Sequence, residues 1–347
     1  MRGRGTIQNP PNRFERLAYL PILESEEGET PSARTQYLKD ISRSLITYND
    51  SPDVGFEASI NPYRGCEHGC IYCYARPYHE YLGFSAGLDF ETRILVKEDA
   101  PELLRAELAS RKWKPQILAI SGVTDAYQPI ERKLQLTRRC LEVLTEFRNP
   151  VIIITKNHLV TRDIDLLKEL AGFNAVAVCV SVTTLDPQLA SVMEPRTSIP
   201  ANRLDAIRAL ADAGVPVRVL VAPTIPGLTD HEMPSIIDAA AKAGASNAGY
   251  VVVRLPYAVS ELFENWLEVN FPDRKKKILN RIRSMRGGKL NDPNFGSRMR
   301  GEGAFAEQIR SMYQIACRRA GIASSGPELS TGAFRRPSEP QLKLFGA

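Results

Sequence analysis

Residues 66–73 read Cys66-Glu-His-Gly-Cys70-Ile-Tyr-Cys73, a CxxxCxxC pattern that places three thiols in one short segment. Iron–sulfur clusters normally take four thiolates, so three cysteines this close together predict a 4Fe–4S cluster with one iron left open for a substrate or cofactor. Gly65 and Gly69 allow the backbone to fold around such a bulky group, and Tyr72 can shield one face of it.

Two other metal sites would use the same cysteines. A zinc ion needs a fourth ligand, and the only imidazoles nearby are those of His68 and His79. His68 lies between two of the cysteines, which would strain it as a ligand alongside both. An ordinary electron-transfer cluster would need a fourth cysteine. The remaining cysteines are distant in sequence and lie in apolar or amphipathic segments, where single thiols usually pack: Cys140, Cys179 and Cys317.

With an aromatic residue, Tyr72, directly before the third cysteine, the segment resembles the CxxxCxΦC signature of the radical S-adenosylmethionine (SAM) superfamily. The resemblance implies that the amino and carboxylate groups of SAM chelate the open iron. It also implies that the reduced cluster splits the sulfonium, giving methionine and a 5′-deoxyadenosyl radical that abstracts hydrogen from a substrate. A low-potential flavodoxin or ferredoxin is implied as electron donor.

Composition restricts the class of protein further. The 347 residues are 43% hydrophobic, and no apolar run approaches the roughly 20 residues of a membrane span. The basic N-terminus is followed by no apolar segment, so we expect no secretory signal, no membrane contact and a cytoplasmic location. Six cysteines are too few for a disulfide scaffold in a chain of this length.

Positive charge is concentrated near the C-terminus. Residues 271–319 contain thirteen Lys or Arg residues against four Asp or Glu, whereas the whole chain has a net charge of only +5. This imbalance predicts a polyanionic partner such as nucleic acid. A set of solvated helix faces is the alternative interpretation.

From Phe56 onward, short apolar runs alternate with amphipathic segments, which predicts parallel strands joined by crossover helices. Strands are expected at 57–61, 116–121, 151–155, 175–182, 217–222 and 249–254, and helices at 99–112, 130–147, 162–171, 200–213 and 231–243. Six units are too few for a closed eight-stranded barrel. They match the open partial (β/α)6 barrel that the resemblance to radical SAM enzymes implies.

The expected organisation has four parts. Residues 1–50 form an extended, partly disordered lead-in, and residues 51–256 form the core barrel. Residues 257–322 form a basic helical cap over the barrel, with helices at 260–270, 274–286 and 302–319. Residues 323–347, rich in Ser, Pro and Gly, form a disordered tail.

Polar residues follow the strands at their carboxyl ends, where active sites of parallel α/β folds lie. Thr124 and Asp125 follow the second strand, and a carboxylate there suits an ammonium group, with helix capping by Asp125 as the alternative. Superfamily members carry Gly-Gly-Glu at this place, which this sequence lacks. Lys156 follows the third strand and suits a carboxylate, and the Ser181 hydroxyl suits a ribose or carboxylate oxygen.

Within the superfamily, residues 59–255 are most similar to spore photoproduct lyase and its bacterial relatives. The residues that carry the similarity are Tyr72-Cys73-Tyr74, Thr124-Asp125, Thr155-Lys156 and Glu194-Pro195-Arg196. The similarity implies that Tyr72 and Tyr74 relay a hydrogen atom, that Lys156 and Ser181 contact SAM, and that Ile225 packs against its adenine. Arg196 is a candidate contact to cofactor or substrate.

One feature of that family is missing. The lyase uses a cysteine near the end of its second strand as hydrogen donor, and this chain has no cysteine between Cys73 and Cys140. The resemblance therefore supports the radical step but does not extend to reversal of thymine dimers.

The C-terminal residues Gln341-Leu342-Lys343-Leu344-Phe345 resemble the QLxLF peptide that binds the bacterial sliding clamp. Leu344 and Phe345 would fill an apolar pocket, while Gln341 and Leu342 complete the motif. A tail that packs back on the protein's own core is the alternative. This motif, the basic helices and the lyase-like core together point toward DNA, and we expect a radical SAM enzyme that acts on DNA in repair or modification. The alternatives are RNA or a small metabolite as substrate, or a non-catalytic iron–sulfur protein tethered to the clamp.

Overall fold

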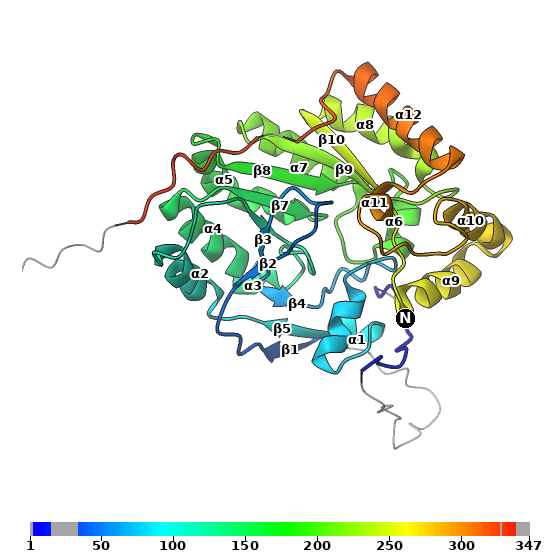
Figure 1. Ribbon diagram of the computed structural model, residues 1–347, viewed down its shortest axis with the longest axis horizontal. Helices are drawn as coiled ribbons and strands as arrows, with labels where there is room; N and C mark the ends of the chain where they lie inside the picture. The colour runs from blue at the N-terminus through cyan, green and yellow to red at the C-terminus, as the bar shows by residue number, and fades with distance from the viewer. Residues whose placement is uncertain (1–2, 15–33, 327, 338–347) are drawn as a thin grey trace, which may run out of the picture.

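The computed structural model describes residues 3–14, 34–326 and 328–337. Its main sheet has seven strands in the order β10-β9-β8-β7-β6-β3-β2, with β10 and β2 at the two edges (Figure 1). Six strands are parallel: β3 (Ala58–Ile60), β6 (Leu118–Ile120), β7 (Val151–Thr155), β8 (Val176–Ser181), β9 (Val217–Thr224) and β10 (Asn247–Val252). Each corresponds to one expected strand, which confirms the open (β/α)6 arrangement.

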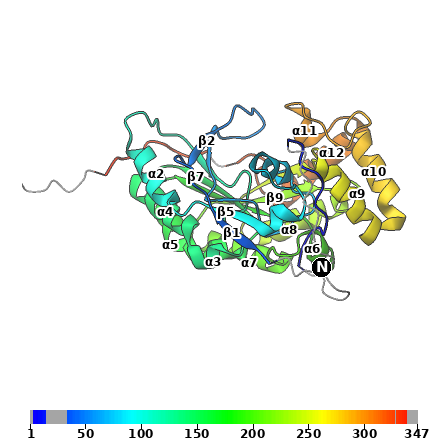
Figure 2. The same cartoon turned by 90° about the horizontal axis from the view of Figure 1, so that it is seen from below.

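Crossover helices cover the outer face of this sheet because their apolar stripes face the strands. They are α2 (Ala100–Ala109), α4 (Leu136–Phe147), α5 (Ile164–Ala171), α7 (Pro200–Asp212) and α8 (Met233–Lys242). Their buried side chains and those of the strands form one continuous hydrophobic core. Figure 2 shows α2, α4 and α5 at one end of the molecule and two C-terminal helices, α9 (Ala258–Asn270) and α10 (Pro272–Ser284), at the other.

The single helix expected at 130–147 is in fact two, α3 (Glu131–Leu134) and α4. Gln135 separates them with a φ of 52°, in the left-handed region. The buried carboxylate of Glu131 accepts hydrogen bonds from the backbone N–H of Thr137 at 3.1 Å and from the Tyr63 hydroxyl at 2.5 Å. It therefore satisfies an amide in the first turn of α4, and the second helix can begin without continuing the first.

A second, smaller sheet of order β1-β5-β4 was not anticipated: β1 (Gln36–Lys39), β5 (Arg93–Val96) and β4 (Tyr63–Arg64). β2 (Ile46–Tyr48), antiparallel to β3, was missed as well. β1 and β2 lie in the expected lead-in, so residues 36–48 contribute strands to both sheets. These strands are short and largely exposed, and they carry little hydrophobic pattern because pairing with distant segments stabilises them.

Residues 3–14 also make specific contacts. Gly5 donates its backbone N–H to Glu91 at 2.9 Å, and Asn12 donates its side-chain amide to the carbonyl of Glu80 at 2.8 Å. Both acceptors belong to short helices that follow the cysteine segment, η1 (Arg76–Leu82) and α1 (Leu88–Thr92). The start of the chain therefore lies against the cysteine segment.

The C-terminal helices do not act as one cap. α9 and α10 pack against the cysteine segment in a second hydrophobic cluster that includes Ile71, Ile225, Phe263 and Ile278. α11 (Ser297–Arg300) lies beside β10, and α12 (Ala304–Ala320) packs mainly on α8. The expectation that all of them cover the barrel is thus wrong for α12, which extends the outer helical layer.

Part of the expected disordered tail follows the body of the protein (Figure 1). Ala323 forms a bridge to Asn247 at the edge of β10, and Arg335 donates its backbone N–H to the carbonyl of Phe147 at 2.9 Å. Phe334 packs against the Phe147 ring at 6.3 Å between centroids. Residues 323–326 and 328–337 form these contacts, whereas the sequence predicted disorder. The QLKLF segment lies outside the described residues.

Among the described residues, no helix is both long enough and apolar enough to cross a membrane.

Candidate active site

The cysteine segment follows β3 and β4 at the carboxyl end of the sheet. Cys66, Cys70 and Cys73 are free thiols, and the first two are buried. Burial, together with the neighbouring Cys66, raises the pKa of the Cys73 thiol, and burial also raises the pKa of Cys70. Because metal binding favours the thiolate, iron at this position would offset the cost of ionising these groups.

Two glycines shape the segment. Gly65 has a φ of 78° and Gly69 a φ of 67°. A Cβ atom at Gly69 would lie 2.7 Å from a carboxylate oxygen of Glu91, and one at Gly65 would lie 3.0 Å from the carbonyl oxygen of Phe90. The turn therefore requires glycine for both its dihedral angles and its close packing.

Arg76 supports the segment from behind, a role that sequence reasoning missed. Its side chain is fully buried and donates from Nε and Nη2 to the carbonyl of Cys70 at 3.1 and 3.0 Å. Its charge is balanced by Glu91 at 2.6 Å. The backbone at the second cysteine is thus held by a buried, charge-assisted contact.

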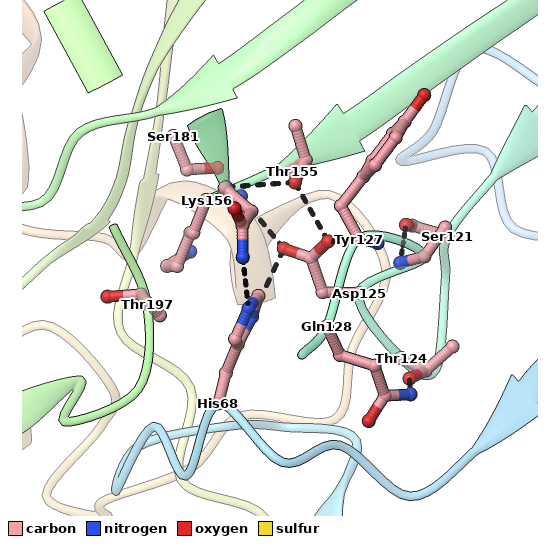
Figure 3. A network of polar contacts seen from close by, with 12 residues as sticks. His68, Ser121, Thr124, Asp125, Tyr127, Gln128, Thr155, Lys156, Ser181 and Thr197 are labelled. Atoms are coloured by element: carbon pink, nitrogen blue, oxygen red, sulfur yellow. Dashed lines mark hydrogen bonds and ion pairs between the residues drawn. The ribbon is translucent and has the colours of Figure 1, made fainter. Parts of the chain in front are cut away.

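His68 is not a free metal ligand. Its Nδ1 lies 3.4 Å from Asp125 Oδ2, and its Nε2 lies 3.1 Å from Asn157 Nδ2 (Figure 3). Burial disfavours the charged ring, but the Asp125 carboxylate and the Cys66 thiol outweigh it and raise the pKa of His68 to about 10. Both ring nitrogens of His68 therefore already contact other side chains, which argues against this imidazole as the fourth ligand of a zinc ion.

Within the described parts of the chain, no three His, Cys, Asp or Glu side chains are grouped as ligands of a single metal ion. In a 4Fe–4S cluster each thiolate binds a different iron atom, so its cysteines need not converge on one point. The three cysteines lie close together in sequence in one glycine-containing turn, as the ligands of such a cluster do.

Asp125 joins three neighbouring segments (Figure 3). Its Oδ1 accepts hydrogen bonds from the Thr155 hydroxyl at 2.8 Å and from the Tyr127 N–H at 2.9 Å, and its Oδ2 accepts from the Lys156 N–H at 2.8 Å. Burial alone would raise the pKa of this carboxyl, but His68 and the backbone donors lower it to about 2. Both carboxylate oxygens are therefore occupied by protein donors.

Thr124 and Gln128 fasten the loop after β6 to the cysteine segment. The Thr124 hydroxyl donates to the carbonyl of Gly65 at 2.7 Å, and Gln128 donates to Thr124 at 3.1 Å. Gln128 Oε1 also accepts from the Glu67 N–H at 2.9 Å. Thr124 thus lies beside the first cysteine, close to the position expected for a cofactor contact.

Lys156, Ser181 and Ile225 lie around the same strand ends. The Lys156 amino group donates to the carbonyl of Ala222 at 3.3 Å, and burial lowers its pKa despite the nearby Cys70 and Asp125. Ser181 ends β8 and is buried. Ile225 is fully buried and shares a hydrophobic cluster with Cys70. The fold therefore gathers these three expected cofactor contacts near the cysteines.

Tyr72 contributes to a buried polar network that sequence reasoning located only in part. Its hydroxyl donates to Glu194, which also accepts from the Thr183 hydroxyl at 2.6 Å. Glu194 forms an ion pair with Arg203, and Arg203 donates to the carbonyl of Ser181 at 3.1 Å. Glu194 and Arg203 are almost completely buried, so each needs the other's charge.

The other two expected contacts, Arg196 and Tyr74, are partly exposed. Arg196 pairs with Glu67 at 3.3 Å and is about one-third exposed. Tyr74 is 44% exposed and donates its hydroxyl to the carbonyl of Gly122 at 2.7 Å, just beyond β6. Their roles toward cofactor or substrate remain predictions.

Replacing Asp125 with asparagine is expected to lower the free energy of unfolding by about 1.5–3 kcal/mol, because the amide keeps one acceptor oxygen and loses the charge facing His68. Chemical denaturation of the reconstituted protein measures this change. Asp186→Asn is the matched control, since Asp186 caps the helix α6 (Pro187–Met193) through the Gln188 N–H and asparagine caps equally well. Equal losses in both variants would contradict the bridging role of Asp125.

Comparison with known proteins agrees with this site. The Radical SAM superfamily profile matches residues 60–240. An uncharacterized protein of Mycobacterium tuberculosis (strain H37Rv) is 35% identical over 248 residues, covering 71% of this chain and 72% of the relative. An uncharacterized protein of Methanocaldococcus jannaschii is 30% identical over 233 residues, covering 67% of this chain and 83% of the relative. The chain belongs to the radical SAM superfamily and is an enzyme of that type.

Among solved structures, spore photoproduct lyase with bound AdoMet and dinucleoside spore photoproduct has a TM-score of 0.62 to this protein. The match covers 89% of this chain and 88% of the lyase at 17% identity. At that identity the match shows a shared fold. Superfamily membership implies a 4Fe–4S cluster and SAM, and the buried cysteine turn fits such a cluster.

Proposed function

We propose that the protein holds a 4Fe–4S cluster through Cys66, Cys70 and Cys73, cleaves SAM reductively, and acts on a base in DNA during repair or modification. The observation that carries this proposal is the buried cysteine turn, held against the strand ends by Thr124 and Arg76. The cluster supplies the electron that splits SAM into methionine and a 5′-deoxyadenosyl radical. A flavodoxin or ferredoxin supplies that electron to the cluster.

Each polar residue of the site has a part in this proposal. Lys156 binds the carboxylate of SAM, and Ser181 contacts a ribose or carboxylate oxygen. Ile225 packs against the adenine. Thr124 and Asp125 are positioning residues. Thr124 holds the cysteine turn and Asp125 holds the Lys156 backbone, and together they fix the distance between the two.

The two tyrosines differ in what they can do. Tyr72 donates its hydroxyl to buried Glu194, so its phenol is fixed in place. Tyr74 is half exposed and bonded only to a backbone carbonyl at the edge of the site, which leaves it able to meet a substrate. Of the two tyrosines, we therefore favour Tyr74 for hydrogen transfer. The missing strand-two cysteine argues for a reaction other than reversal of thymine dimers.

Three observations support DNA over RNA or a small metabolite. The C-terminal helices are basic, the shared fold is that of a lyase crystallised with a dinucleoside photoproduct, and the QLKLF segment resembles a clamp-binding peptide. An enzyme acting on a base must reach it outside the base stack, which an open barrel beside a basic surface allows.

Anaerobic assays test the proposal. The reconstituted, reduced enzyme is incubated with SAM and with UV-irradiated DNA, undamaged DNA, RNA or no nucleic acid, and 5′-deoxyadenosine is quantified. We expect formation to increase with DNA. Equal formation in all four samples would retain the radical chemistry and reject DNA as substrate. No formation from a fully loaded cluster would support the non-catalytic, clamp-tethered alternative.

For the clamp contact, Phe345→Ala is expected to abolish binding of the full chain to immobilised sliding clamp, because the ring fills the apolar pocket that anchors such peptides. Lys343→Ala is the control, since this position is variable in the motif and its side chain is not an anchor. Surface plasmon resonance measures both. Unchanged binding of Phe345→Ala would contradict the motif assignment.

A further inference from the structure

A group of arginines and exposed aromatic rings lies where β10 ends, beside the cysteine turn. Arg254 follows β10, and Arg298 belongs to α11, which packs against that strand. The rings are those of Tyr74, Tyr78 and Phe295, which are 44%, 53% and 52% exposed. We name these five residues the arginine–aromatic surface.

The positive charge of this surface is incompletely neutralised by the protein. Within the described residues, the buried Nε of Arg254 has no hydrogen-bond partner, and Arg254 forms no ion pair. The Arg254 guanidinium lies 4.0 Å from Met299 Sδ, a weak acceptor. Burial and the positive charge of Arg298 lower the pKa of Arg254, so the two guanidinium groups are close enough to repel.

A rigid frame holds these groups together. Arg286 lies beneath them and donates to the carbonyls of Val253 at 2.6 Å and Arg298 at 3.1 Å, which ties α11 to the end of β10. Arg298 also forms an ion pair with Asp53 and donates to Ser51 at 2.6 Å. The Arg298 guanidinium is therefore held in place by the Asp53 and Ser51 side chains, and Arg286 fixes the backbone around it, as in a preformed anion site.

The aromatic rings alternate with the charges. The Arg254 guanidinium lies 5.4 Å from the centre of the Tyr74 ring, and the Arg298 guanidinium lies 4.3 Å from that of Phe295. Tyr74 directly follows Cys73, so the surface begins at the cysteine turn. Flat exposed rings beside guanidinium groups are the combination that binds single-stranded nucleic acid, through stacking on bases and contacts to phosphates.

We propose that the arginine–aromatic surface binds an unpaired stretch of nucleic acid next to the reacting base, with Arg254 on a phosphate and Phe295 and Tyr78 under bases. This rests on the proposed function in that the same strand carries the substrate base. An acidic protein would use the arginines without the rings, so the rings favour nucleic acid.

Fluorescence anisotropy of the reconstituted full-length protein with labelled single-stranded DNA, over a series of salt concentrations, tests the surface. Phe295→Ala should weaken binding about fivefold or more through lost stacking. Arg254→Gln should reduce the slope of log affinity against log salt by about 0.7, the effect of one phosphate contact. Arg208→Gln, an exposed arginine of α7 paired with Asp205, is the matched control and should bind as wild type.

The outcomes separate this inference from the proposed function. Binding by wild type that both variants retain in full would reject the surface and leave DNA as substrate. Absence of binding to single-stranded DNA at low salt would reject both. Competition by polyglutamate as effective as that by unlabelled DNA would show a general polyanion site and overturn the inference. Arg254→Lys, which keeps the charge, should retain the wild-type salt slope; a slope reduced as in Arg254→Gln would contradict the phosphate contact.

Discussion

Cys70→Ala is expected to remove the brown chromophore and bring iron content and 5′-deoxyadenosine formation to background. A cluster bound through three protein thiolates cannot replace one of them when the neighbouring imidazole is engaged, as that of His68 is by Asp125 and Asn157. Iron and sulfide analysis, visible absorption and anaerobic turnover measure the change.

Cys140→Ala provides the matched control. Cys140 is fully buried in α4, within the main hydrophobic core and distant in sequence from the cysteine turn. Its replacement removes a small apolar group and should leave the chromophore and the iron content intact. A Cys70→Ala protein with the wild-type visible spectrum would refute the ligand assignment.

Arg203→Met should lower the free energy of unfolding by about 3–5 kcal/mol, because it leaves the Glu194 carboxylate buried without its partner. The side chains of Arg203 and Glu194 are 1% and 0% exposed, so solvent cannot replace the lost interaction. The change should also loosen Tyr72, whose hydroxyl donates to the same carboxylate, and thereby weaken retention of the cluster. Denaturant unfolding followed by circular dichroism measures the stability, and iron release measures the second effect.

The same helix supplies the control for this prediction. Arg208 lies on α7 as Arg203 does and also forms an ion pair, with Asp205 at 2.9 Å, but its side chain is 58% exposed. Arg208→Met should therefore cost about 0–1 kcal/mol. Adding Glu194→Gln to Arg203→Met should recover part of the loss, since the unpaired charge is then removed. Similar losses for the two arginine variants would show that the buried pair has no special role.

Glu194 and Arg196 illustrate how far sequence reasoning reached. The Glu-Pro-Arg segment indicated a charged pair near the strand ends, and we selected Arg196 as the contact. In the structure the partly exposed Arg196 pairs with Glu67, whereas Glu194 lies at the centre of the buried network. Its ion-pair partner, Arg203, is on the following helix, and an amphipathic helix pattern does not reveal which arginine turns inward.

The sequence by itself determined the cysteine turn and the six parallel strands. Thiol spacing and alternating hydrophobic patterns are local properties, so they can be recognised without knowing what packs against them. The glycines on either side of Cys66 were recognisable for the same reason, since left-handed turns require that residue.

Only the tertiary structure decided which polar groups meet. Asp125 with His68, Arg76 with the Cys70 carbonyl, and Arg254 with Tyr74 each join segments whose contacts depend on how strand ends and loops converge. The small sheet and the described part of the tail follow the same rule. Their stability comes from pairing with distant segments, and a contact between distant residues leaves no periodic signal in either one.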